Sequence, residues 1–382
     1  MTKKVAIIGA GVVGASAAYL LSKEDDIDLT VYDEGTGQGT SAAAGIISPW
    51  LSRRRNKKWY HMVREGAAYY PVFLSDVMEG EAIPSSVYKQ VGTLLFKKKE
   101  AYIHEMFAIG EKRKIDAPEI GELAILSPDE IREKVPLYSG ENSAVWASGG
   151  ARVDGGKLVE LLLSKAEKNG AKVVRQHVAF NTVKGSHQYA IQTEQSTEQF
   201  ESVILTASAW LPDILTPLDY AVDVRPQKGQ LAEVKLAEFD TQDWPVMMPE
   251  GESDIIPFED GRVIIGATHE DDKGFNLTID EDMLDDMVQK GTTIFTEELR
   301  SAPITQYRSG TRAYTSDYAP FFGEVPELPN VYAASGLGST GLTAGPLVGK
   351  CLAESVLGLP STLNEADYPI WNYVKKKSRD NC

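Results

Sequence analysis

The pattern of apolar and polar positions is clearest at the start of the chain. Residues 4–8 form a short apolar run rich in β-branched side chains, which predicts a buried strand. Residues 15–21 follow with the pattern of a helix, and residues 29–32 return to that of a strand. The stretch therefore predicts a βαβ unit.

The same reasoning predicts elements along the rest of the chain. Helices are expected at 59–78, 100–113, 154–168 and 280–299, and strands at 91–96, 171–174, 176–183, 202–205 and 330–334. Ser127 precedes a proline and two acids, so it is the expected N-cap of a further helix. Residues 222–234, 255–258 and 262–267 favour an antiparallel sheet. Because βα elements recur far from the first unit, we expect an α/β fold whose main sheet is assembled from separated segments.

Three glycines occupy the junction between the first strand and its helix. Gly9, Gly11 and Gly14 have the G-x-G-x-x-G spacing, and Asp33 ends the second strand. The glycines permit a tight turn, close approach to a pyrophosphate and close helix packing, and the acid can accept hydrogen bonds from a ribose. The pattern predicts a site for an ADP-containing dinucleotide and does not distinguish NAD from FAD. The alternative is a glycine-rich turn that binds no ligand.

Two further segments rich in small residues and one basic segment add to this interpretation. Residues 34–45 form a loop of small side chains, and residues 336–349 form a second glycine-rich junction that leads into a helix reaching about Leu357. Residues 52–58 carry five basic side chains, which we interpret as a solvated loop or helix start rather than an anion site.

Composition narrows the class of protein. The chain has 382 residues, enough for two domains, and its formal charge is 39 − 55 = −16. Such a charge disfavours nucleic acid and anionic membranes as partners. No apolar run of transmembrane length is present, so no membrane span is expected. Cys351 and Cys382 do not suggest a disulfide framework, so we expect a cytoplasmic protein. No metal site is expected.

Several motifs together resemble the D-amino-acid oxidase-like (DAO) family of FAD-dependent oxidoreductases, which includes glycine oxidase, sarcosine oxidase and bacterial D-amino-acid dehydrogenases. Besides the first fingerprint, they are TSAAAG (40–45), ARVDGGKL (151–158), GRVIIGATHED (261–271), SGTRAYTSDYAPFFG (309–323) and GLGSTGLT (336–343). The resemblance covers nearly the whole chain.

The resemblance implies an α/β fold with a Rossmann-like FAD-binding domain and an α+β substrate domain that contains an antiparallel sheet. We expect the FAD domain at 1–85, 145–218 and 303–382, and the substrate domain at 86–144 and 219–302. By matching position, the residues expected to contact FAD are Gly9, Gly11, Val12, Val13, Gly14, Asp33, Glu34, Ser41, Gly45, Val178, Gly338, Ser339, Thr340, Gly341 and Leu342.

The resemblance also implies a reaction, the oxidation of an amine or amino acid of the glycine or D-amino-acid class. Hydride would pass from the α-carbon to the flavin N5, and the imine would hydrolyse. Arg312 matches the carboxylate-binding arginine of the family. A guanidinium suits this role because it grips a carboxylate with two parallel hydrogen bonds. Molecular oxygen, a quinone or a redox partner would accept the electrons, and self-association into a homo-oligomer is left open.

The sequence departs from the family pattern at several positions. Asp254 stands where glycine oxidase has a pocket tyrosine, and an aspartate there could attract a cationic amine. His269 follows the GAT motif and is a candidate acid or base. Ser208 and Gly156 replace the usual glycine and proline, and Ser339 stands where some members carry a second arginine. A 2-hydroxy acid dehydrogenase and a flavin-binding subunit that needs a partner protein therefore remain alternatives.

Overall fold

The computed structural model describes residues 2–37, 39–251 and 253–377, and the chain divides into two compact units. Unit 1 comprises Met1–Thr40, Val159–Gln227 and Thr311–Cys382, and unit 2 comprises Ser41–Leu158 and Lys228–Gly310. These boundaries assign residues 41–85, 145–158 and 303–310 to unit 2, whereas the sequence places them in the FAD domain. The function of each unit stays a prediction.

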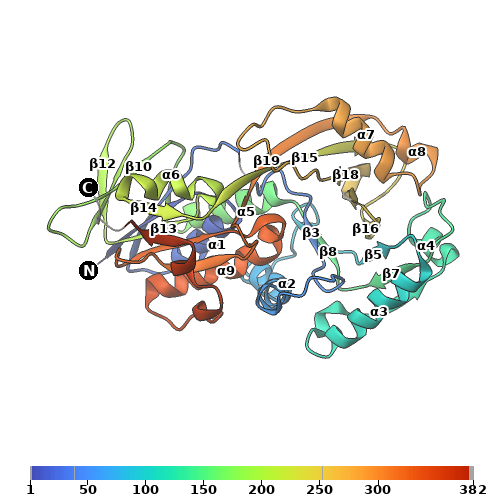
Figure 1. Cartoon of the computed structure of the whole chain (residues 1–382), viewed down its shortest axis with the longest axis horizontal. Helices are drawn as coiled ribbons and strands as arrows, with labels where there is room; N and C mark the ends of the chain where they lie inside the picture. Colours follow the sequence, from blue (N-terminus) through green and yellow to red (C-terminus); the bar gives the residue numbers. More distant parts are fainter. Residues whose placement is uncertain (1, 38, 252, 378–382) are drawn as a thin grey trace. The chain divides into compact units, whose positions relative to one another are not determined.

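Unit 1 is built around a six-stranded sheet in the order β20-β21-β13-β1-β2-β9. Figure 1 labels β13 of this sheet and the helices α1 (Val12–Leu21) and α9 (Gly341–Leu357). The strands of the sheet are β1 (Lys3–Ile8), β2 (Ile27–Tyr32), β9 (Lys172–Val174), β13 (Ser202–Leu205), β20 (Phe321–Glu324) and β21 (Val331–Ser335). All neighbours are parallel except β20 and β21. Because these strands come from three distant parts of the chain, the expectation of a sheet assembled from separated segments is confirmed.

Two helices of unit 1 follow the glycine-rich junctions and pack closely together, α1 (Val12–Leu21) and α9 (Gly341–Leu357). A Cβ at Gly349 would lie 2.5 Å from the Val13 carbonyl oxygen, so glycine is required for this close approach. The remaining elements are α6 (Leu211–Leu215), β10 (Ala179–Thr182), β11 (Tyr189–Gln192), β12 (Thr197–Phe200), β14 (Tyr220–Val222) and β22 (Val374–Lys376). The thiol of Cys351 is buried and free, and Cys382 lies outside the described residues.

Unit 2 contains most of an eight-stranded sheet in the order β19-β15-β18-β17-β16-β5-β7-β6. Its strands are β5 (Thr93–Phe96), β6 (Leu123–Leu126), β7 (Ala144–Ala147), β15 (Arg225–Lys235), β16 (Val246–Met248), β17 (Asp254–Pro257), β18 (Arg262–Gly266) and β19 (Ile304–Tyr314). The hairpin of β17 and β18 and the pairing of β18 with β15 are antiparallel, as the sequence predicts. The long strand β19 has no counterpart in the sequence prediction.

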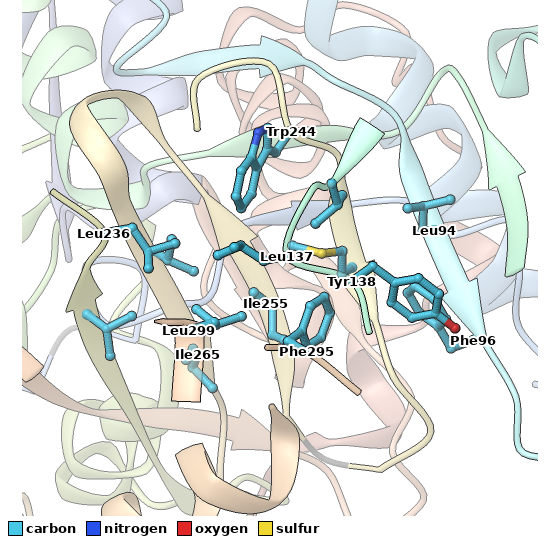
Figure 2. Close-up of a cluster of buried hydrophobic side chains, with 14 of the residues drawn as sticks. Leu94, Phe96, Leu137, Tyr138, Leu236, Trp244, Ile255, Ile265, Phe295 and Leu299 are labelled. Atoms are coloured by element: carbon cyan, nitrogen blue, oxygen red, sulfur yellow. The ribbon is translucent and has the colours of Figure 1, made fainter. Parts of the chain in front are cut away.

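A continuous apolar cluster holds unit 2 together. It gathers Leu94, Phe96, Tyr138, Trp244, Ile255, Ile265 and Phe295 with further apolar side chains (Figure 2). Unit 2 also contains β3 (Ile46–Ile47), β4 (Tyr88–Gln90), β8 (Ala151–Val153), α2 (Lys57–Val77), α3 (Glu100–Lys114) and α4 (Pro128–Lys134). Helix α5 (Gly155–Lys168) carries the chain from unit 2 into unit 1.

The ends of the helices predicted after Ser127 and at 280–299 depend on individual residues. Ser127 caps α4 through a complete capping box with Glu130, which confirms the predicted N-cap. The predicted acidic helix at 280–299 is wrong, because the structure has α7 (Glu281–Gly291) and α8 (Glu297–Arg300) separated by a turn. Gly291 fits there because a Cβ would overlap the Ser253 side chain. No helix in the described part of the chain is both long and apolar enough to cross a bilayer.

Candidate active site

The first glycine-rich turn of unit 1 has the geometry that a dinucleotide site needs. Gly9 adopts a positive φ of 102°, and Gly14 sits so close to the Gly9 carbonyl oxygen that a Cβ would overlap it. Gly11 is the N-cap of α1 and makes no side-chain cap. A Cβ at Gly11 would meet only the Thr40 hydroxyl, at 3.3 Å, so the space beside this helix end is open.

Asp33 lies beside this turn. One carboxylate oxygen accepts a hydrogen bond from the Ala10 N–H at 2.6 Å, and the other accepts from the Gly35 N–H at 2.7 Å. A Glu34 carboxylate oxygen lies 2.9 Å from the His177 ring nitrogen. Val178, the next residue, therefore lies near the end of β2, which Asp33 and Glu34 follow. The structure therefore brings three separately predicted FAD residues, Asp33, Glu34 and Val178, to one edge of unit 1.

The second glycine-rich turn precedes α9. Gly338 to Thr340 form a single 3-10 turn, and neither the turn nor α9 has a side-chain cap. The Ser339 N–H donates to the Tyr314 hydroxyl at 3.0 Å. Neither α1 nor α9 is capped by the side chain of its own N-cap residue, although the Val12 N–H of α1 donates to the Thr40 hydroxyl at 3.1 Å. The positive ends of the two helix dipoles suit the phosphates and the ring of FAD. These residues thus fit the cofactor that the resemblance implies.

The two predicted FAD residues in unit 2, Ser41 and Gly45, lie in the loop of small side chains. Gly45 has a φ of 88°, and its carbonyl accepts from the Val153 N–H at 2.8 Å. The Arg308 guanidinium lies 3.5 Å from the Ser41 carbonyl oxygen. The loop therefore runs beside β8 and beside a charged cluster within unit 2.

That charged cluster alternates acids and bases. Glu233 is 2.6 Å from Arg308 and 3.2 Å from Arg262, and Arg262 is 2.8 Å from Asp154. Burial opposes ionisation of Asp154, but the hydrogen bond from the Lys157 N–H and the charge of Arg262 outweigh it, so its pKa lies below the usual value. The four charges cancel, which is how charges are tolerated in partly buried positions.

Arg312 lies on β19 in unit 1. Its Nη1 donates to the Gln227 side-chain oxygen at 3.1 Å, and Gln227 is buried in β15. Tyr314, two residues farther along β19, shares its face. Tyr307 instead donates to Asp285 on α7, so the two tyrosines that flank Arg312 in the sequence have different surroundings.

Asp254 and His269 lie at the same end of the β17–β18 hairpin in unit 2. Asp254 begins β17 opposite Gly266, the last residue of β18, and His269 follows three positions later. Burial raises the pKa of the Asp254 carboxyl to about 7, and the charge of Lys97 partly offsets this effect. His269 is exposed.

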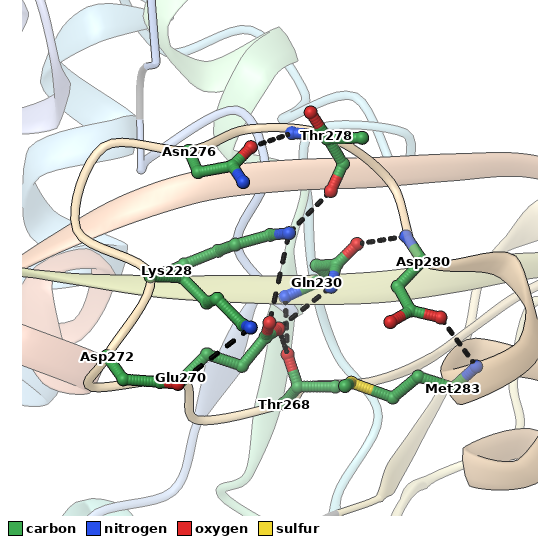
Figure 3. Close-up of polar contacts among 10 residues, drawn as sticks. Lys228, Gln230, Thr268, Glu270, Asp272, Asn276, Thr278, Asp280 and Met283 are labelled. Carbon is green, nitrogen blue, oxygen red and sulfur yellow. Dashed lines mark hydrogen bonds and ion pairs between the residues drawn. The ribbon is translucent and has the colours of Figure 1, made fainter.

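A buried polar cluster anchors the segment that carries His269 (Figure 3). Glu270 accepts from the Thr268 hydroxyl at 2.6 Å and from the Gln230 side-chain amide at 2.8 Å, and it lies 3.8 Å from the Lys228 ammonium. All four side chains are less than 9% exposed. Since Thr268 and Glu270 flank His269, this cluster fixes the backbone on both sides of the histidine.

Sequence reasoning missed Gln227, Arg225 and Glu270. The first two belong to the segment RPQKGQ (225–230), whose polar residues recur within a predicted strand. That recurrence is a usable signal, because polar side chains in a buried strand need partners. Ser208 adopts a positive φ of 54°, which explains why glycine is usual at that position in the resembled family.

Comparison with known proteins agrees with this geometry. The family described as FAD dependent oxidoreductase (DAO) matches residues 4–355. An uncharacterised oxidoreductase, YurR, of Bacillus subtilis (strain 168) is 37% identical over 96% of this chain and 98% of its own. A glycine oxidase of Pseudomonas putida is 25% identical over 96% of this chain and 98% of its own.

Solved structures lead to the same family. The iminodiacetate oxidase of Chelativorans sp. BNC1 superposes with a TM-score of 0.88 and 31% identity, covering 95% of this chain and 98% of its own. Glycine oxidase of Geobacillus kaustophilus superposes with a TM-score of 0.82 and 22% identity, covering 97% and 99%, which shows the shared fold. The expected fold class and the FAD cofactor are confirmed, and the chain belongs to the DAO family of FAD-dependent oxidoreductases.

Proposed function

We propose that this enzyme oxidises an amine or amino acid that carries a carboxylate next to the reacting carbon. The observation that carries the proposal is Arg312, a guanidinium held by Gln227 on the face of β19 that also bears Tyr314. A guanidinium binds a carboxylate through two parallel N–H groups and so fixes the position of the α-carbon. The relatives named glycine oxidase and iminodiacetate oxidase act on substrates of this kind, which supports the proposal.

In the proposed reaction, Arg312 orients the substrate through its carboxylate. FAD supplies the two-electron acceptor that receives hydride from the α-carbon. The amine nitrogen loses a proton, and water adds to the substrate imine to give an oxo acid and ammonia or an amine. We assign His269 and Asp254 to the substrate side as candidate groups that take up this proton or attract the amine.

A 2-hydroxy acid is the second candidate substrate, because it would present the same carboxylate to Arg312. The test is an anaerobic titration of the purified holoenzyme, followed by flavin absorbance, with glycine, sarcosine, iminodiacetate, D-amino acids and 2-hydroxy acids. Bleaching by an amine with release of ammonia or a smaller amine supports the proposal. Bleaching by hydroxy acids alone would replace it. Reoxidation by oxygen or by a quinone then identifies the acceptor.

A further inference from the structure

Unit 2 carries a strongly basic region, although the chain as a whole is acidic. Residues 50–60 and 97–116, which we call the basic surface, contain eleven basic and four acidic side chains, a net charge of 11 − 4 = +7. The remainder of the chain therefore has a formal charge of −16 − 7 = −23. Repulsion of anions by the whole chain assumes evenly spread charge, so this separation makes unit 2 locally attractive to them.

Side-chain contacts join the two segments of the basic surface along α3. At the first turn of the helix, the Arg53 guanidinium lies 4.7 Å from the Tyr102 ring centroid, and the Lys99 ammonium lies 5.8 Å from the same centroid. At the last turn, the Arg113 guanidinium lies 4.1 Å from the Tyr60 ring centroid. The first segment therefore contacts α3 near both of its ends, and the cations of the two segments belong to one surface.

Six cations of the basic surface form no ion pair with any residue that the structure describes. They lie at the start of α2, just before α3 and in the last turn of α3: Arg55, Lys57, Lys98, Lys99, Lys112 and Lys114. Five of these side chains are exposed, and Lys114 is half-buried. Arg53, by contrast, is paired with Glu105 at 2.7 Å. The acids of the surface therefore leave most of its positive charge uncompensated.

The aromatic rings of the basic surface are in contact with its own arginines. Besides the two arginines that lie over tyrosine rings, Arg54 lies 4.3 Å from the centroid of the Trp59 ring. Of the six unpaired cations, only Arg55 is not a lysine. Protein interfaces are enriched in arginine and aromatic residues and depleted of lysine. A lysine presents a compact charge on a flexible stem, which suits a fluid anionic lipid surface better than a partner of fixed shape.

An exposed apolar side chain lies beside these cations. Ile115 directly follows Lys114 at the end of α3, three residues after Lys112, and it is 82% exposed. At the surface of a bilayer, an apolar side chain enters the boundary between headgroups and acyl chains, while lysines extend their ammonium groups to the phosphates. An exposed isoleucine next to unpaired lysines therefore favours lipid over other anions as the ligand.

We propose that the basic surface of unit 2 binds the anionic headgroups of a lipid bilayer, so that the enzyme associates with a membrane surface. The inference goes beyond the proposed function and does not depend on which substrate is oxidised. Each Lys or Arg close to an anionic bilayer strengthens binding by about fivefold, and salt weakens the attraction. Six unpaired cations and one apolar side chain thus supply reversible binding.

The test measures binding of the holoenzyme to lipid vesicles by co-sedimentation. Vesicles of phosphatidylcholine alone are compared with vesicles that also contain about 30% phosphatidylserine. In about 0.1 M salt, we expect at least about tenfold tighter binding to the anionic vesicles, and about 0.5 M salt should remove most of that difference because it screens the charges. Equal affinity for both kinds of vesicle in about 0.1 M salt would overturn the proposal.

Variants at both ends of α3 show whether the basic surface is responsible. Lys98→Gln with Lys99→Gln, and separately Lys112→Gln with Lys114→Gln, should each weaken binding to anionic vesicles roughly ten- to thirtyfold, because two cations are lost. Ile115→Ser keeps the charge and should weaken binding about threefold or more, because no apolar side chain then enters the bilayer. Flavin absorbance and urea unfolding of these variants should match those of the wild type. Wild-type vesicle binding by both double variants would rule the surface out.

A matched pair of lysines controls for net charge. Lys168 and Lys184 are exposed and belong to unit 1. Lys168→Gln with Lys184→Gln removes the same charge and should leave vesicle binding within about twofold of the wild type. A loss equal to that of the variants at the basic surface would show that net charge governs binding, and the assignment to this surface would then be wrong.

An acidic protein is the other class of partner that these cations could bind, and polyglutamate serves as its probe. Binding to polyglutamate as tight as to anionic vesicles, with no effect of Ile115→Ser on vesicle binding, would assign the surface to acidic proteins and reject the lipid. Weak binding to polyglutamate beside tight vesicle binding that depends on Ile115 supports the proposal. None of these measurements involves turnover, so this inference and the proposed function can fail independently.

Discussion

Arg312 Nη1 donates to the Gln227 side-chain oxygen at 3.1 Å across strands β19 and β15. Gln227 is only 4% exposed, so the contact is shielded from bulk water. An amide oxygen accepts one N–H without neutralising the guanidinium. The pair therefore orients the arginine through a neutral contact, whereas a glutamate at position 227 would place a negative charge against it.

Replacing either partner should change substrate binding more than FAD binding. Arg312→Met should lower kcat/KM for carboxylate substrates roughly ten- to a thousandfold, because a charged two-point contact is lost. Gln227→Glu keeps the shape but places a negative charge against Arg312, and it should raise KM about tenfold with little change in kcat. Steady-state kinetics and the ratio of flavin to protein absorbance measure both effects. Normal turnover in Arg312→Met would show that the anchor lies elsewhere.

The glycines of the first turn should separate cofactor binding from folding. A side chain at Gly11 meets only the Thr40 hydroxyl, so Gly11→Val should fold but bind FAD at least tenfold more weakly, because it fills the space beside the helix end. A side chain at Gly14 overlaps the Gly9 carbonyl, so Gly14→Val should lower the free energy of unfolding by about 3 kcal/mol or more. FAD titration and urea unfolding of the apoprotein distinguish the two. Full FAD occupancy in Gly11→Val would contradict this geometry.

The sequence predicts best what depends on local pattern. The β1–α1–β2 unit, the Ser127 cap and the end of α9 at Leu357 follow from apolar periodicity, capping residues and glycine spacing. The presence of β13 and β21 in the same sheet as β1 agrees with the recurrence of βα elements along the chain and with the family resemblance.

Contacts between distant residues are harder to predict. Strand β19 contains arginines, glycine and serine, and its apolar pattern is weak because its partners are polar groups such as Gln227 and Glu233. Gln227 and Arg312 are 85 positions apart, so no local rule connects them. The cluster around Glu270 has the same character, because its members come from β15 and from the segment after β18.

The buried pair of Lys228 and Glu270 should show strong coupling. Glu270→Gln leaves the Lys228 ammonium buried opposite a neutral group, and we expect it to lower the free energy of unfolding by roughly 3 kcal/mol. Lys228→Met in the same chain should recover most of that loss, since no uncompensated charge then remains. Urea unfolding of the wild type, both single variants and the double variant gives the coupling energy. Additive single effects would show that the two charges act independently.

Asp254 should make stability depend on pH in a way that most carboxylates do not. Its pKa is about 7 in the folded protein, because burial opposes ionisation, and about 3.9 in the unfolded chain. The folded state therefore holds the proton more tightly, so this group destabilises the fold increasingly as pH rises from about 4 to 7. Asp254→Asn cannot ionise and should escape the effect.

The variant should match the wild type near pH 4.5 and exceed its free energy of unfolding by about 1 to 2 kcal/mol at pH 8. This difference is smaller than the full shift in pKa would give, because the side chain is only partly buried and solvent screens its charge. Urea unfolding at pH 4.5, 6, 7 and 8 measures the difference. Asp116→Asn, at an exposed position in the same unit, should leave the pH profile unchanged. If the Asp254→Asn and wild-type profiles stay parallel across this range, Asp254 ionises as an ordinary surface carboxylate, and its assignment to a partly desolvated substrate-side position fails with it.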